Sequence, residues 1–206
     1  MKVLLFNGSP HEKGCTYTAL SEVANTIAAE GIETEIVWLG TEPIHSCTAC
    51  RSCATAKKCV FDDIVNEAAA RCAEADGFIF GTPVHYAAAT GMLTTFMDRL
   101  FYTIGKTLAF KPAAGVVSCR RSGSTATFDQ LNKYFTICQM PVVPSQYWNA
   151  VHGHAPEDVR QDLEGMQTMR TLARNMAWML KCIAVGTEAG VPRPVQEERV
   201  NTNFIR

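Results

Sequence analysis

The sequence predicts an α/β domain built on a doubly wound parallel sheet of five strands. Five short apolar runs alternate with segments of helical periodicity, which is the pattern of a parallel sheet covered on both faces. The chain has 206 residues, of which 47% are hydrophobic and 19% charged, so it can fill a core and is not a disordered chain. Because crossovers between parallel strands are right-handed, the expected strand order is 2-1-3-4-5.

Local patterns give each element in order. The expected strands are short apolar runs bounded by turn residues, at 2–6, 33–39, 77–81, 113–118 and 141–147. The expected helices show apolar residues at helical spacing, at 16–30, 62–75, 91–104, 125–139 and 156–189. Gly31 and Gly190 end the first and last helices, Asp62 and Pro156 begin two others, and the last helix is kinked or split near Gly165.

This pattern predicts one domain over residues 1–190, with a cysteine-rich insertion loop at 43–61 and a polar C-terminal arm at 191–206. The apolar stripe of the long C-terminal helix is expected to pack against the sheet. Its methionines and Trp178 also allow part of it to contact another subunit.

Charge and hydropathy exclude several classes of protein. The formal net charge is −1, which gives no basis for a nucleic-acid partner or for binding at an acidic membrane surface. The first apolar run has only six residues, and no later segment has about 18 uninterrupted apolar residues, so we expect a cytoplasmic protein without a membrane partner. Nine cysteines in such a protein are not expected to form structural disulfides, and a cluster among them indicates metal or redox chemistry.

The loop after the first strand, residues 7–16, predicts an anion site. Ser9, Gly14 and Thr16 lie where a buried strand meets a helix N-terminus, whose free N–H groups and dipole bind phosphate. Ser9 and Thr16 add hydroxyl donors, and His11 or Lys13 adds positive charge. The spacing is neither that of a P-loop nor that of a dinucleotide fingerprint. The alternative is an ordinary strand–helix turn capped by Thr16.

Three segments together carry a family resemblance: Gly8-Ser9-Pro10 with Gly14-Cys15-Thr16, then Thr82-Pro83-Val84-His85-Tyr86, then Gly91 to Asp98-Arg99. Over roughly residues 1–153 the chain resembles the NAD(P)H-dependent FMN reductase family of flavodoxin-like proteins. The resemblance implies that the first loop holds the FMN phosphate and that residues 82–86 run along the isoalloxazine ring. Cys15 stands where the family commonly has Asn, so backbone N–H groups are expected to take over that contact. For the aromatic pair, the alternative is that Tyr86 is core and His85 exposed.

The loop after the fourth strand contains Cys119, Arg120, Arg121 and Gly123. The resemblance implies that it lies beside the flavin pyrimidine, where a cation stabilises reduced flavin or attracts the phosphates of NAD(P)H. The alternative is that both arginines are solvated. Residues 145–153 form a further family-like segment, which is expected to line the pocket or an oligomer contact. Because hydride passes directly from NAD(P)H to the flavin, no catalytic side chain is expected.

Four cysteines, Cys47, Cys50, Cys53 and Cys59, have the spacing C-x2-C-x2-C-x5-C. Four thiolates so close in sequence suit an iron–sulfur cluster or zinc. The spacing is similar, position for position, to that of the iron–sulfur flavoprotein branch of the same family. This resemblance implies a [4Fe-4S] cluster that exchanges single electrons with FMN. Zinc and free or oxidised thiols are the alternatives.

The expected function is that of an FMN-dependent NAD(P)H oxidoreductase. Electrons would pass from a nicotinamide through the flavin to a quinone, flavin, ferric or ferredoxin-like protein acceptor. The alternatives are a non-catalytic electron carrier of the flavodoxin type and a metal-regulated binding module. The nearly neutral charge and the Arg120-Arg121 loop favour the enzyme, because strong acidity would steer a carrier to basic partners. The resemblance also implies a homodimer or homotetramer.

Overall fold

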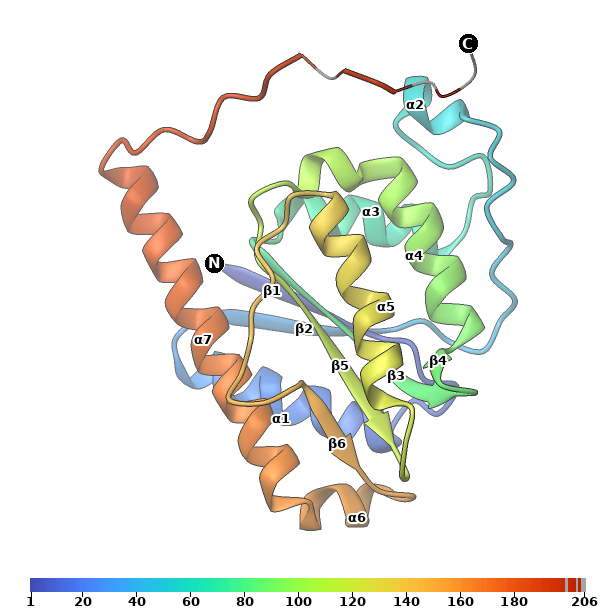
Figure 1. Ribbon diagram of the computed structural model, residues 1–206, viewed down its shortest axis with the longest axis vertical. Helices are drawn as coiled ribbons and strands as arrows, with labels where there is room; N and C mark the ends of the chain where they lie inside the picture. Colours follow the sequence, from blue (N-terminus) through green and yellow to red (C-terminus); the bar gives the residue numbers. More distant parts are fainter. Residues whose placement is uncertain (199, 203, 205–206) are drawn as a thin grey trace.

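The computed structural model describes residues 1–206 except 199, 203, 205 and 206. Its sheet has the order β2-β1-β3-β5-β6, which confirms the predicted topology (Figure 1). These five strands run parallel. A sixth, two-residue strand, β4, pairs antiparallel with β3. The strand bounds are Lys2–Asn7 (β1), Glu33–Trp38 (β2), Gly77–His85 (β3), Ala88–Ala89 (β4), Ala113–Cys119 (β5) and Ala150–His152 (β6).

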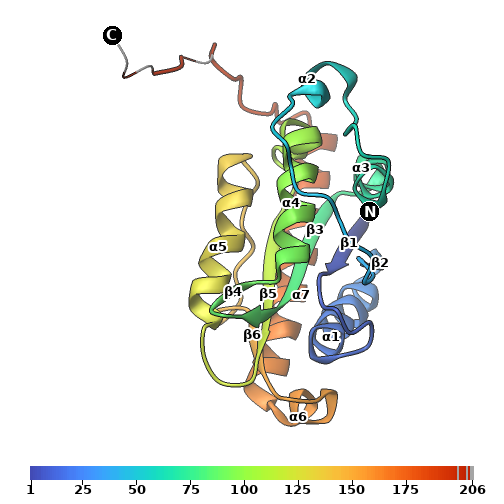
Figure 2. The same ribbon diagram turned by 90° about the vertical axis from the view of Figure 1, so that its right-hand side faces the viewer.

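Helices cover both faces of the sheet (Figure 2). Alternate side chains of β1 point to opposite faces of the sheet. Val3 and Leu5 pack with α1 and α7, whereas Leu4 and Phe6 pack with α3, α4 and α5. These four side chains are fully buried, which explains the continuous apolar run of β1 in the sequence. The helix bounds are Cys15–Ala29 (α1), Ser52–Ala56 (α2), Ile64–Glu74 (α3), Gly91–Ile104 (α4), Gly105–Leu108 (η1, a 3-10 turn), Ser124–Ile137 (α5), Pro156–Gln161 (α6) and Leu163–Glu188 (α7).

The fifth parallel strand differs most from the prediction. The expected segment 141–147 makes only one bridge, between Val142 and Ala113, and the regular strand is β6, eight residues further on than Val142. Pro141 and Pro144 have no N–H to donate to a sheet ladder. The chain therefore makes one bridge at the start of β5 and forms a regular pairing only at the end of β5, through β6.

The predicted C-terminal helix is divided into α6 and α7. The break is at Asp162, whose carboxylate accepts a hydrogen bond from the N–H of Gly165 at 2.9 Å and so caps α7. Helix α7 buries Met169, Leu172 and Met176 against the sheet, while Trp178 is exposed. Helix α3 begins at Ile64 and is capped by Asp63, not by Asp62 as expected.

The predicted arm leaves the end of α7 at Gly190, and its described residues form no helix or strand. Residues 199, 203, 205 and 206 of this arm lie outside the described residues. Among the described helices, none combines the length and the apolar character that crossing a bilayer requires.

Candidate functional site

The loops that follow β1 and β3 are tied to each other at the carboxyl edge of the sheet. The N–H of Gly8 donates to the carbonyl oxygen of Gly81 at 2.9 Å, and Thr90 Oγ1 donates to the carbonyl of Gly8 at 2.8 Å. A Cβ added to Gly8 would lie 2.7 Å from Leu93 Cβ, so only glycine fits there. The two segments that the sequence singled out therefore form one rigid unit.

The first loop folds around Ser9. This serine is buried, its Oγ accepts a hydrogen bond from the N–H of His11 at 3.1 Å, and its carbonyl accepts from Trp38 Nε1 at 2.8 Å. His11 and Lys13 are exposed. The predicted loop is thus held by its own polar groups, and its two basic side chains face solvent.

Helix α1 begins at this loop with its N-terminus available to an anion. Gly14 is the residue before the helix, and no side chain in the described part of the chain caps it. The N–H groups of the first turn therefore retain their capacity to bind a ligand, at the positive end of the helix dipole.

Two predicted phosphate contacts, Cys15 and Thr16, also contact residues from other parts of the chain. Thr16 is buried, and its Oγ1 is 2.8 Å from Ser118 Oγ at the end of β5. Its hydroxyl therefore joins the first loop to β5. Cys15 Sγ lies 3.8 Å from the carbonyl oxygen of Gly153. Partial burial raises the pKa of the Cys15 thiol, which keeps it neutral beside an anion.

The segment after β3 is a hairpin, which the sequence did not predict. Strand β3 extends through Thr82, Pro83 and Val84 to His85, four residues beyond the expected end at Gly81. Tyr86 and Ala87 form the turn with positive φ angles of 52° and 57°, and β4 returns. Such turns favour Asn-Gly, so a Tyr-Ala pair is strained by about 1–3 kcal/mol per residue. The tip presents Tyr86 fully exposed, beside the exposed His85.

The loop after β5 packs directly on this hairpin. Gly123 has a φ of 87°, and a Cβ there would meet Ala87 Cα and Val84 Cγ1, both at 2.9 Å. Cys119 is buried, and burial raises its pKa, whereas Arg120 and Arg121 are exposed. The loops after β1, β3 and β5 thus converge as the predicted topology requires.

An open hollow of about 690 Å³ lies beside these loops and is lined by Arg120, His152, Gly153, His154 and Asp158. The sequence pointed to residues up to Gly153 but did not single out His154 or Asp158. The N–H groups of His154 and Ala155 donate to Asp158 Oδ2 at 2.9 and 3.0 Å and lower the pKa of that carboxyl. Only the short helix α6 brings Asp158 back to the sheet edge, and no sequence motif marks it.

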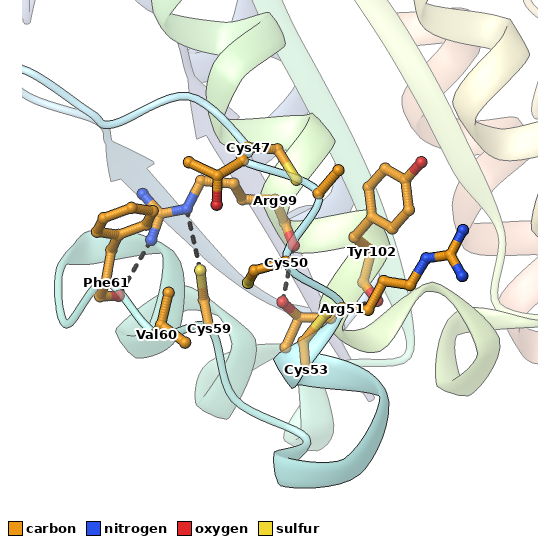
Figure 3. Close-up of a pocket in the computed structure, with 12 residues that line it drawn as sticks. Cys47, Cys50, Arg51, Cys53, Cys59, Val60, Phe61, Arg99 and Tyr102 are labelled. Atoms are coloured by element: carbon orange, nitrogen blue, oxygen red, sulfur yellow. Dashed lines mark hydrogen bonds between the residues drawn. The ribbon is translucent and has the colours of Figure 1, made fainter.

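The four spaced cysteines line one cavity of about 160 Å³ (Figure 3). Cys47, Cys50, Cys53 and Cys59 come from the loop that precedes α2, from α2 itself and from the turn after it. They are free thiols, and among the described residues no three or more potential ligands lie close enough together to hold a metal ion. A backbone N–H from Ser52 hydrogen-bonds Cys50 and lowers its pKa, which favours the thiolate that binds metals.

The backbone of this loop is strained. Ala49, Arg51 and Lys57 all have positive φ angles, of 53°, 61° and 55°. Residues other than glycine rarely adopt this conformation, at a cost of about 1–3 kcal/mol each, and it clusters at ligand clamps and active sites. These kinks turn cysteines from three successive segments toward the same space.

Helix α4 separates the cysteine cavity from the loops at the carboxyl edge of the sheet. Thr90 caps the start of α4 at the carboxyl edge, whereas Tyr102, near its end, lines the cavity, and its carbonyl lies 3.6 Å from Cys53 Sγ. Tyr102 lies eleven residues after Gly91, which corresponds to about 16 Å along the helix. The two candidate sites therefore lie at opposite ends of α4 (Figure 1).

Comparisons with known proteins agree with this geometry. The family model of NADPH-dependent FMN reductases matches residues 1–155. The chain is 35% identical to an iron-sulfur flavoprotein of Methanocaldococcus jannaschii over 89% of this chain and 99% of that protein. It is 29% identical to an iron-sulfur flavoprotein of Methanosarcina thermophila, over 89% and 97% of the two chains.

Among solved structures, an NAD(P)H:quinone oxidoreductase from Methanothermobacter marburgensis superposes with a TM-score of 0.67 at 16% identity, covering 85% of this chain and 96% of that one. An archaeal flavodoxin gives a TM-score of 0.59 at 14% identity, covering 88% and 99%. At these identities the likeness shows the fold, which is flavodoxin-like. The family match covers three quarters of the chain, and the chain therefore belongs to the NADPH-dependent FMN reductase family, whose chemistry is flavin-based oxidation and reduction.

Proposed function

We propose that this chain is an FMN-dependent NAD(P)H oxidoreductase that binds FMN along the carboxyl edge of its sheet. Electrons would pass from the nicotinamide to a quinone, flavin, ferric or protein acceptor. The observation that carries the proposal is the mutual contact of the loops after β1, β3 and β5. Gly8 bonds to Gly81 and to Thr90, and Gly123 packs on Val84 and Ala87.

The start of α1 suits the phosphate of FMN. The uncapped N–H groups after Gly14 provide donors, and the folded loop around Ser9 holds them in place. Exposed His11 and Lys13 add positive charge, and the neutral Cys15 thiol adds no repulsion. This end of the site therefore binds and orients the cofactor through backbone groups.

The hairpin of β3 and β4 suits the ring. When bound, FMN supplies the acceptor for a hydride, so the protein residues bind, orient and shield rather than act as acid or base. Residues 82–86 run along the edge of the site, with Tyr86 and His85 free to lie against an aromatic ring. Arg120 and Arg121 place positive charge where reduced flavin gains negative charge or where nicotinamide phosphates arrive.

We further propose that Cys47, Cys50, Cys53 and Cys59 hold a [4Fe-4S] cluster. All four thiols face one cavity, the loop is kinked to bring them there, and Cys50 is biased toward the thiolate. Four soft thiolate ligands fit iron–sulfur better than hard cations. When bound, such a cluster supplies one-electron transfer, and the names of the two archaeal relatives support this assignment.

Assembly into a homodimer or homotetramer is part of the proposal. Exposed apolar side chains on α7 and α5, namely Trp178, Val185 and Ile137, provide surface for a second copy. Light scattering of the purified protein tests this, and a monomer at micromolar concentration would remove it.

The decisive experiment is anaerobic purification followed by absorbance, FMN and iron analysis, and steady-state oxidation of NADH and NADPH. We expect one FMN per chain, about four iron per chain, and turnover with quinone, ferric chelate or free flavin. A protein that takes up no FMN would overturn the flavin site. FMN binding without NAD(P)H oxidation would identify an electron carrier instead. Trace iron, or zinc in its place, would remove the cluster and leave the reductase.

A further inference from the structure

Arg99 is the largest fully buried side chain of the chain's described residues, with an exposed fraction of 1%. It projects from α4 onto the wall of the cysteine cavity (Figure 3). Charged side chains are almost never fully buried unless they are paired. The sequence placed Arg99 in a family-like segment but gave it no role, so its burial needs an explanation.

All five N–H donors of its guanidinium are used. Nε donates to Cys59 Sγ at 3.2 Å. Nη1 donates to the carbonyl of His45 at 3.2 Å and to the carboxylate of Asp63. Nη2 donates to the carbonyl of Phe61 at 3.0 Å and to Asp63 Oδ1 at 2.9 Å. An arginine has five such donors, so the side chain is saturated by its partners.

Every one of these partners belongs to a single segment, residues 45–63. His45 precedes the first cysteine by two residues. Cys59 is the last cysteine, and Phe61 and Asp63 follow it. The Phe61 ring also lies 5.1 Å from the guanidinium carbon and stacks on the His45 ring at 3.9 Å. One residue of a rigid helix therefore fastens both ends of the cysteine loop together.

Stability alone does not account for this arrangement. Removing two charges from water costs several kcal/mol per ion, and buried ion pairs often stabilise a fold no more than apolar residues of the same size. The cysteine loop, in contrast, has only the five-residue α2 of regular structure and three strained residues, so it needs an external support. Five directed hydrogen bonds provide such a support.

We propose that Arg99 is the positioning residue of the cysteine centre. It holds the two ends of residues 45–63 together, so that the four thiols face one cavity. It also donates a hydrogen bond to the sulfur of the fourth cysteine. This inference rests on the proposed function, because it assumes that the thiols bind metal. A hydrogen bond to a ligand sulfur favours the more negatively charged, reduced state, so Arg99 also raises the reduction potential of the centre.

The test compares Arg99→Lys with Arg170→Lys in the full chain, purified anaerobically. Lysine keeps the charge but cannot fill five fixed positions. Arg170 pairs with Glu22 on α1, away from both candidate sites, and controls for the loss of an arginine ion pair. The readouts are iron per FMN, the rate at which a ferrous chelator extracts iron, and the midpoint potential.

For Arg99→Lys we expect iron loss at least about 10-fold faster, because groups that orient a metal ligand affect metal affinity by about 10–100-fold. Residual centres should have a lower midpoint potential, and FMN content should match that of the wild type. For Arg170→Lys we expect all three readouts to be unchanged. Equal iron retention and equal potential in Arg99→Lys and the wild type would overturn the role of Arg99 while leaving the centre intact.

A second variant and a second metal test the proposal in two further cases, namely a variant that does not fold and a wild type that holds no iron. If Arg99→Lys does not fold, Asp63→Asn serves in its place, because asparagine still caps α3 but removes the carboxylate that fixes Arg99. We expect it to speed iron loss to the chelator in the same direction, and wild-type retention would contradict the proposal. If the wild type holds no iron, titration with Co²⁺ decides the cysteine centre. The absence of thiolate-to-cobalt absorbance would overturn the centre and, with it, the role of Arg99.

Discussion

The two candidate sites of this molecule are built in different ways. The carboxyl edge of the sheet is made of backbone: the start of α1, the ends of β1, β3 and β5, and glycines that permit close approach. The cysteine cavity is made of side chains on an irregular loop that depends on one arginine of α4. The first site is a consequence of the fold, whereas the second is an addition to it. A change in one should therefore leave the other working.

The largest expected effect is the loss of metal from Cys47→Ser. Serine does not supply a soft thiolate, so we expect iron to fall from about four per chain to less than one. FMN content and NADPH oxidation with small acceptors should persist, because α4 separates the two sites. Iron and FMN analysis measure both. Cys182→Ser, an exposed cysteine of α7, is the control and should change neither. Simultaneous loss of FMN in Cys47→Ser would mean that the two sites are coupled.

The second-largest expected effect is on the affinity for FMN. It tests whether the FMN phosphate binds at the start of α1, and it separates the effect of a negative charge from that of side-chain shape. Gly14→Asp and Gly14→Asn have the same shape and both cap α1, but only aspartate adds a negative charge. We expect Gly14→Asp to bind FMN about 10-fold more weakly than Gly14→Asn, because a like charge within a few ångströms costs at least about 1 kcal/mol. Fluorescence titration of free FMN measures the ratio. Equal affinities would place the phosphate elsewhere.

A smaller effect concerns the strained hairpin. Ala87 has a φ of 57°, which glycine adopts without cost. We therefore expect Ala87→Gly to raise stability by about 1 kcal/mol, measured as a higher urea midpoint of the FMN-free protein. If the strain orients Tyr86 toward the flavin, FMN affinity should fall in the same variant. Ala88→Gly, in the adjacent strand, has no strained angle to relieve and should be destabilising. A lower urea midpoint for Ala87→Gly would show that the turn is not strained.

The same contrast explains what the sequence could predict. Strand order, both helical layers and the loops at 7–16 and 119–123 follow from periodicity and turn residues that are local in the chain. The hairpin was missed because Tyr86-Ala87 carries no Asn or Gly to indicate the turn. The fifth strand was predicted too early in the sequence, at 141–147 rather than Ala150–His152, because no local pattern in residues 141–152 indicates which of them pair with Val117–Cys119.

Side-chain partners across the fold were the least predictable part. Thr16 turns toward Ser118, and Arg99 fastens residues 45–63, because distant segments meet there. The spacing of the four cysteines predicted which residues share a cavity, since it is a local pattern. It could not predict what holds them, since Arg99 is 40 residues beyond Cys59 in the sequence.

The smallest expected effect is a pH dependence at the open hollow beside the loops at the carboxyl edge of the sheet. Asp158 accepts hydrogen bonds from the N–H groups of His154 and Ala155, which lower its pKa in the folded protein. A carboxyl with a lowered folded pKa contributes stability above its unfolded pKa, near 4, and that contribution disappears as pH falls through the folded value. Asp158→Asn removes this dependence. The difference in urea midpoint between wild type and variant should therefore be constant from pH 7 to about pH 5 and shrink below about pH 4. A difference that stays constant down to pH 3 would mean that the carboxylate of Asp158 is not held by these N–H groups.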